Sequence, residues 1–147
     1  MLSALWDDQN PDYDSATRAE MLLRTIESVK AAGVHRIVVL GSAPEWTAPV
    51  PLLLIRDIHG NPYNPVPHRL ARSLLEAHDD ILLRATTLRA GAVYVPIFES
   101  LCDQTSCIAT TGPGWKDVVT YDQAHFTEHG SILVTQLIWS AIIGSKR

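Results

Sequence analysis

Residues 36–40 constrain the fold more than any other part of the sequence. After Arg36 the run is Ile-Val-Val-Leu, short, apolar and mostly β-branched, which is typical of a strand buried on both faces of a parallel sheet. A second run of this kind covers residues 92–97, and residues 2–6 form a third candidate strand. Segments with helical spacing separate these runs, so the order of elements predicts an α/β fold with a parallel sheet.

Four helices are expected, over residues 15–32, 52–58, 66 or 68 to 89, and from 128 onward. Asp14 or Ser15 can cap the first helix, and Thr127 is well placed to cap the last. Gly33 and Gly91 follow the first and third helices as stop signals. Residues 98–121 show no regular pattern, and we expect an irregular segment there.

The expected sheet is small for the single domain that residues 1–147 predict. Doubly wound domains usually have about five strands or more, and an apolar edge strand left uncovered favours aggregation. Either another segment or a second subunit completes the sheet, or the chain holds more strands than its pattern reveals.

Composition excludes some classes of function. The net charge of −4 and the absence of a Lys/Arg cluster give no basic field, so we predict no binding to nucleic acid. The longest apolar run, residues 132–143, is too short to cross a bilayer and indicates a buried helix. Residues 1–8 lack the basic start and apolar length of a signal peptide.

Asp122 and His125 are the strongest candidates for chemistry. They stand three residues apart in a loop that precedes the last helix, near the edge where the strands end, which is where open α/β sheets place their sites. Asp122 can orient the imidazole of His125, which then acts as a general base toward a serine hydroxyl. The alternative is that Asp122 caps a local turn and His125 is an ordinary loop residue.

The nucleophile that such a pair requires is not obvious. The sequence contains neither Gly-Asp-Ser nor Gly-x-Ser-x-Gly. Ser42 is a weak candidate because it directly follows a buried strand, but Pro44 stands where a helix should begin. The site therefore combines an acid and a base with an unknown nucleophile.

Three tryptophans and two cysteines complete the candidates. Trp6, Trp46 and Trp115 lie at or beyond strand ends, where they either line a substrate rim or pack internally. Cys102 and Cys107 form a local disulfide, which would indicate an oxidising compartment, or remain two reduced thiols. No second Cys/His pair stands at ligand spacing, so we predict no metal and no cofactor.

These residues resemble the SGNH (GDSL-like) hydrolase superfamily. The likeness is closest to the SGNH domain fused behind integral-membrane acyltransferases that O-acetylate bacterial cell-surface polysaccharides. It rests on the strand at residues 2–6, the helix at 15–32, the strand and loop at 38–44, the cysteine pair, and residues 121–131. The last segment, Tyr-Asp-Gln-Ala-His-Phe-Thr-Glu-His-Gly-Ser, is similar to the closing Asp-x-x-His block of the family and is its most specific signal.

The resemblance implies a flavodoxin-like three-layer fold in which Asp122 and His125 are members of a Ser-His-Asp triad. It also implies an acylated carbohydrate as substrate, a membrane acyltransferase domain as partner, and a place on the periplasmic or extracellular side of the membrane. The family's Gly-Asp-Ser block and its oxyanion-hole glycine block have no counterpart here, which implies that the N-terminal part of the domain lies outside this chain. The alternatives are a non-catalytic carbohydrate-binding or structural module, in which the tryptophans matter more than Asp122, and a half-domain completed by another chain.

Overall fold

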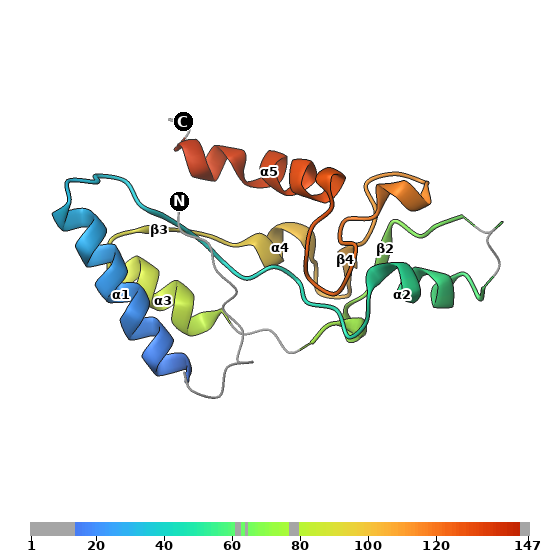
Figure 1. Cartoon of the computed structure of the whole chain (residues 1–147), viewed down its shortest axis with the longest axis horizontal. Coiled ribbons are helices and arrows are strands. Elements are labelled where there is room, and N and C mark those ends of the chain that lie inside the picture. The colour runs from blue at the N-terminus through green and yellow to red at the C-terminus, as the bar shows by residue number, and fades with distance from the viewer. Residues whose placement is uncertain (1–13, 61–62, 64, 77–79, 145–147) are drawn as a thin grey trace. The chain divides into compact units, whose positions relative to one another are not determined.

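The computed structural model describes residues 14–60, 63, 65–76 and 80–144 (Figure 1). These residues divide into two compact units: one holds residues 14–42 and 80–97, and the other holds residues 43–76 and 98–144. The candidate strand at residues 2–6 lies outside the described residues. The assignment of the whole chain to one domain stays a prediction.

The first unit contains the parallel strands. It consists of α1 (Ser15–Ala31), β1 (Val38–Leu40), α3 (Ile81–Arg89) and β3 (Val93–Val95). β1 pairs with β3 in parallel, with Val39 opposite Tyr94, and α1 packs beside α3 (Figure 1). The expected α/β class with a parallel strand pair is therefore confirmed.

Local signals set the ends of α1. Its N-cap is Asp14, whose carboxylate accepts a hydrogen bond from the backbone N–H of Thr17 at 2.7 Å. Gly33 follows the helix with a φ of 88°, a conformation that glycine adopts without steric cost. The apolar face of the helix places Leu22 and Ile26 in a core with Val39. Both expected boundaries are confirmed.

The second unit is built mainly from long-range pairing. Its elements are α2 (Val50–Asp57), β2 (Arg69–Ala71), the 3₁₀ turn η1 (Arg72–Leu74), β4 (Ser106–Ile108), η2 (Trp115–Asp117) and α5 (Glu128–Ile143). α4 (Ile97–Leu101) begins at the junction of the two units. β2 and β4 are antiparallel, with Leu70 opposite Cys107, and both residues lie in a core that includes Trp46, Val50 and Leu54.

The expected long helix from residue 66 or 68 to 89 is wrong. Among the described residues of this range, the α-helix is limited to α3, because Leu70 is buried in the strand pair and Arg69 donates hydrogen bonds to Ser106. Burial and cross-strand hydrogen bonding there outweigh the helical spacing of the sequence. Residues 98–121 are likewise more regular than expected, since they contain α4 and β4.

Candidate active site

Hydrogen bonds join the two ends of the segment that carries Asp122 and His125. At its end, Thr127 donates two hydrogen bonds to the preceding segment, from its backbone N–H to the Val119 carbonyl at 2.9 Å and from its hydroxyl to the Val118 carbonyl at 2.6 Å. The same hydroxyl caps α5 by accepting from the N–H of Gly130 at 3.0 Å. Residues 120–126 therefore form a short loop with both ends held together, and the expected cap at Thr127 is confirmed.

Asp122 organises this loop with both carboxylate oxygens. Oδ1 accepts hydrogen bonds from the backbone N–H groups of His125 at 2.8 Å and Ala124 at 2.9 Å. Oδ2 lies 2.8 Å from Nδ1 of His125. The two backbone N–H groups, His125 first, lower the pKa of Asp122 from 3.8 to about 2, so the carboxylate is ionised at neutral pH.

The ionised carboxylate determines which nitrogen of His125 is protonated. A carboxylate without its proton can only accept hydrogen bonds, so Nδ1 must carry the hydrogen in the neutral ring. Nε2 then has a lone pair, and the side chain is 73% exposed. These contacts agree with both interpretations of the pair. Asp122 caps a local turn, and it also holds the imidazole of His125 in the orientation that a general base requires.

The loop is tethered to the segment that leads into α2. The backbone N–H of Trp46 donates to the Gln123 carbonyl at 2.9 Å, and the N–H of Val50 donates to the Asp122 carbonyl at 3.3 Å. Trp46 is only 3% exposed and packs in the core of this unit. Val50 is buried in the same core, so these two hydrogen bonds tie the backbone of Asp122 and Gln123 to that core.

Ser42 lies in the first unit, where its polar atoms have a carboxylate partner. Its backbone N–H and its hydroxyl donate to Asp80 at 2.8 and 2.7 Å, and Tyr94 donates to the same carboxylate at 2.5 Å. Asp80 is buried at the start of α3 and joins the segment just after β1 to Tyr94 in the middle of β3. This geometry gives Ser42 a structural role, and its role as a nucleophile stays a prediction.

Sequence reasoning missed Asp80 because it lay inside the long helix expected there. An acidic residue directly before the apolar run at the start of α3 was the signal that could have marked it as a helix start.

The three candidate tryptophans differ in how far they are buried. Trp46 is buried, and its indole packs in the core beside Val50 and Leu54. Its burial therefore favours internal packing over a place on a substrate rim. Trp115 is 38% exposed in η2, and its place on a rim stays a prediction. Trp6 lies outside the described residues.

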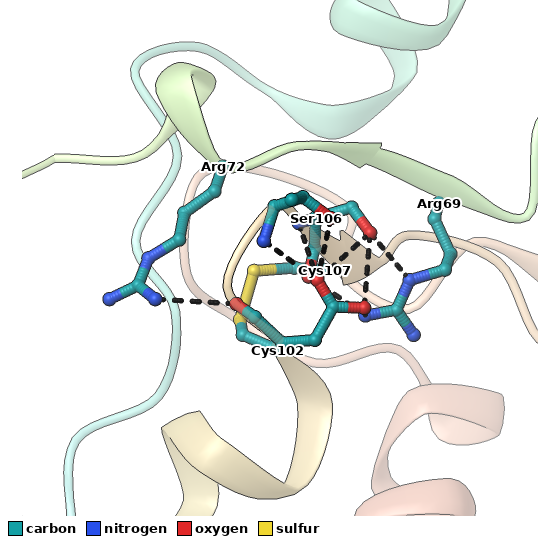
Figure 2. Close-up of a disulfide and its surroundings, with 7 residues drawn as sticks. Arg69, Arg72, Cys102, Ser106 and Cys107 are labelled. Carbon is teal, nitrogen blue, oxygen red and sulfur yellow. Dashed lines mark hydrogen bonds and ion pairs between the residues drawn. A yellow bond between two sulfur atoms is a disulfide. The ribbon is translucent and has the colours of Figure 1, made fainter.

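Cys102 and Cys107 are joined by a disulfide that closes the turn between α4 and β4 (Figure 2). Arg69 and Arg72 flank this turn (Figure 2). Arg69 donates to the Asp103 carboxylate at 2.9 Å, and Arg72 donates to the Asp103 carbonyl at 3.3 Å. Backbone N–H groups of Thr105 and Ser106 lower the pKa of Asp103 to about 2, so this turn is held by charge as well as by sulfur.

Within the described ranges, no cluster of three or more His, Cys, Asp or Glu side chains is placed to hold a metal ion. Across the same ranges, none of the helices combines the length and the hydrophobicity needed to cross a membrane.

The profile of the SGNH domain fused to AT3 domains matches residues 1–140. The chain belongs to this family. The SGNH assignment agrees with the resemblance of the closing Asp-x-x-His block, which the match includes. No match was found among the curated proteins.

Among solved structures, the SGNH chain is similar to the lipopolysaccharide acetyltransferase periplasmic domain of Salmonella ser. Paratyphi A. The TM-score is 0.81 at 23% sequence identity, and the match covers 97% of this chain. The same match covers 55% of the Salmonella domain, so the chain spans about half of that domain's length. At this identity the likeness shows the fold, and it confirms the expected SGNH-type architecture.

Proposed function

We propose that this chain supplies the acid and base of an acyl-transfer site. His125 takes the proton of a serine hydroxyl at Nε2 as that oxygen attacks an ester carbonyl, and it later returns the proton to the leaving oxygen. Asp122 holds Nδ1–H and stabilises the imidazolium that forms between these steps. The observation that carries the proposal is the Asp122–His125 pair itself, with its 2.8 Å contact and its backbone-held carboxylate.

The family and the structural neighbour guide the choice of substrate and partner. The matched family is fused to AT3 domains, and the neighbour is the periplasmic domain of a lipopolysaccharide acetyltransferase. We therefore propose that the chain acts with a membrane acyltransferase domain, on the periplasmic side, in moving an acetyl or similar small acyl group on a cell-surface carbohydrate. The disulfide between Cys102 and Cys107 supports an oxidising compartment.

The nucleophile in this proposal comes from polypeptide outside these 147 residues. Two observations support this: the sequence has no Gly-Asp-Ser, and the hydroxyl of its best-placed serine, Ser42, donates to Asp80. Loss of one triad member costs a serine hydrolase up to about a million-fold in rate. We therefore expect the chain alone to show little or no esterase activity.

The proposal is tested by labelling with a fluorophosphonate probe and by hydrolysis of an aryl acetate. The chain alone is compared with the same chain joined to the nucleophile-bearing part of an SGNH domain. We expect a label and turnover only in the joined protein, both lost with His125→Ala and with Asp122→Ala. The matched control is His129→Ala, which removes an exposed histidine four residues away and should leave turnover unchanged.

Two results would overturn this proposal. Turnover by the joined protein that survives His125→Ala would show that this imidazole is not the base. A label on Ser42 in the chain alone, lost with His125→Ala, would show that the chain holds its own complete triad.

A further inference from the structure

The ring of Tyr121 stacks on the ring of His125. The two centroids are 5.8 Å apart and the planes differ by 17°, within the range of offset-stacked aromatic pairs. Tyr121 stands at the start of the loop and His125 at its end, so the loop closure described above brings the rings together. The backbone N–H of Tyr121 also donates to the His125 carbonyl at 3.1 Å.

The imidazole of His125 needs a second restraint. Asp122 holds the ring at Nδ1, at one edge, while 73% of the side chain is exposed. A single hydrogen bond at one edge leaves a planar ring able to tilt about that contact. A parallel ring against its face opposes this tilt, and Tyr121 provides such a ring.

We propose that Tyr121 is a positioning residue, whose ring keeps the imidazole of His125 in the plane where Nδ1–H meets Asp122 and Nε2 faces the reaction. The importance of this for catalysis rests on the proposed function. The restraint itself is a property of Tyr121, Asp122 and His125 alone and needs no substrate.

The surroundings of the Tyr121 side chain allow its contact with His125 to be removed without a large loss of folding stability. The side chain is 58% exposed and so adds little to the core. Its backbone hydrogen bond to His125 does not involve the side chain, and together with the hydrogen bond from the N–H of Thr127 to the Val119 carbonyl it forms the β-bridge between Thr120 and Phe126 that closes the loop. A substitution of Tyr121 therefore removes the ring contact and leaves the loop scaffold in place.

The test measures the tautomer of His125 by NMR in protein labelled with ¹⁵N-histidine, at about pH 9 where an ordinary imidazole is neutral. His125 is assigned from the signal that disappears in His125→Gln. The variants are Tyr121→Phe, which keeps the ring, and Tyr121→Leu, which removes it. Tyr63→Leu is the matched control, because Tyr63 is 93% exposed and lies outside this loop.

We expect a majority of the Nδ1–H tautomer in the unmodified chain, in Tyr121→Phe and in Tyr63→Leu. In Tyr121→Leu the ratio of Nδ1–H to Nε2–H should fall about two- to tenfold, the range set by the strength of aromatic pairs. An unchanged ratio in Tyr121→Leu would overturn the proposal. An equal fall in Tyr121→Phe would also overturn it, because the ring would then not be the cause.

A second measurement needs no substitution. Nuclear Overhauser effects between the ring protons of Tyr121 and His125 are expected in the unmodified chain, and their absence would overturn the proposal even if Tyr121→Leu disturbs the loop. In an active joined protein, Tyr121→Leu should lower kcat and leave KM unchanged. If the joined protein is inactive, the proposed function fails, while the tautomer ratio still decides the role of Tyr121.

Discussion

Gly130→Ala is the substitution that links the fold of this chain to its site most directly. Gly130 lies in the first turn of α5, and a Cβ added there would stand 2.0 Å from the carbonyl oxygen of Val119 and 2.8 Å from its carbonyl carbon. These are backbone atoms of a buried segment, so they cannot turn aside as a flexible side chain would. The start of α5 must therefore move away from Val119, and the loop that ends in His125 moves with it.

The size of the effect follows from three contributions. Forcing a methyl group into a packed contact costs about 2 kcal/mol. The two hydrogen bonds that Thr127 donates to Val118 and Val119 weaken, at about 1 kcal/mol each. Alanine recovers about 1 kcal/mol of helix propensity relative to glycine, so the free energy of unfolding should fall by about 3 kcal/mol.

The assay is urea unfolding followed by tryptophan fluorescence, since Trp46 is buried in the same unit and reports its loss of structure. Ser131→Ala is the matched control, because Ser131 is exposed in the same turn and its substitution should change stability by less than about 0.5 kcal/mol. If Gly130→Ala is as stable as the unmodified chain, the close approach of α5 to Val119 is not a real constraint.

Four further predictions concern three other contacts. Asp122→Asn should abolish the Nδ1–H preference of His125 in the ¹⁵N spectrum; an unchanged tautomer would contradict the pairing. Because folding lowers the pKa of Asp122 from 3.8 to about 2, the ionised carboxylate stabilises the fold fully above pH 3.8, and this stabilisation is lost as the pH falls through about 2. Acid unfolding should therefore be less steep in Asp122→Asn. Asp80→Ala leaves three hydrogen-bond donors without their carboxylate and should cost about 2–4 kcal/mol in urea unfolding; a loss below about 1 kcal/mol would contradict its role. Replacing both Cys102 and Cys107 by serine opens a short loop and should cost about 2 kcal/mol by loop entropy, measured in the same way; equal stability would show that the turn is held by charge alone.

Features with local causes were accessible from the sequence. The ends of α1 follow from Asp14 and Gly33, each of which acts on its own helix end. The Asp122–His125 contact spans three residues, so spacing alone brought the two side chains within reach of each other. Its position before an apolar helix, together with the block that follows, also indicated the family that the profile match established.

Features with distant causes were not accessible. The helical spacing of residues 66–89 gave no sign that Leu70 would pair with Cys107, and the sequence left Trp46 equally fit for a rim or a core. The hydroxyl of Ser42 donates a hydrogen bond to Asp80, which is 38 residues away in the sequence.

The sequence by itself therefore determined the α/β class, the N-caps of α1 and α5 and the contact between Asp122 and His125. Only the tertiary structure decided where residues 69–71 belong, what buries Trp46 and what holds Ser42. The physical reason is that propensities differ by less than about 1 kcal/mol per residue for ordinary residues, while burying one large side chain contributes about 2 kcal/mol. Contacts between residues far apart in the chain therefore overrule local preference wherever the two disagree.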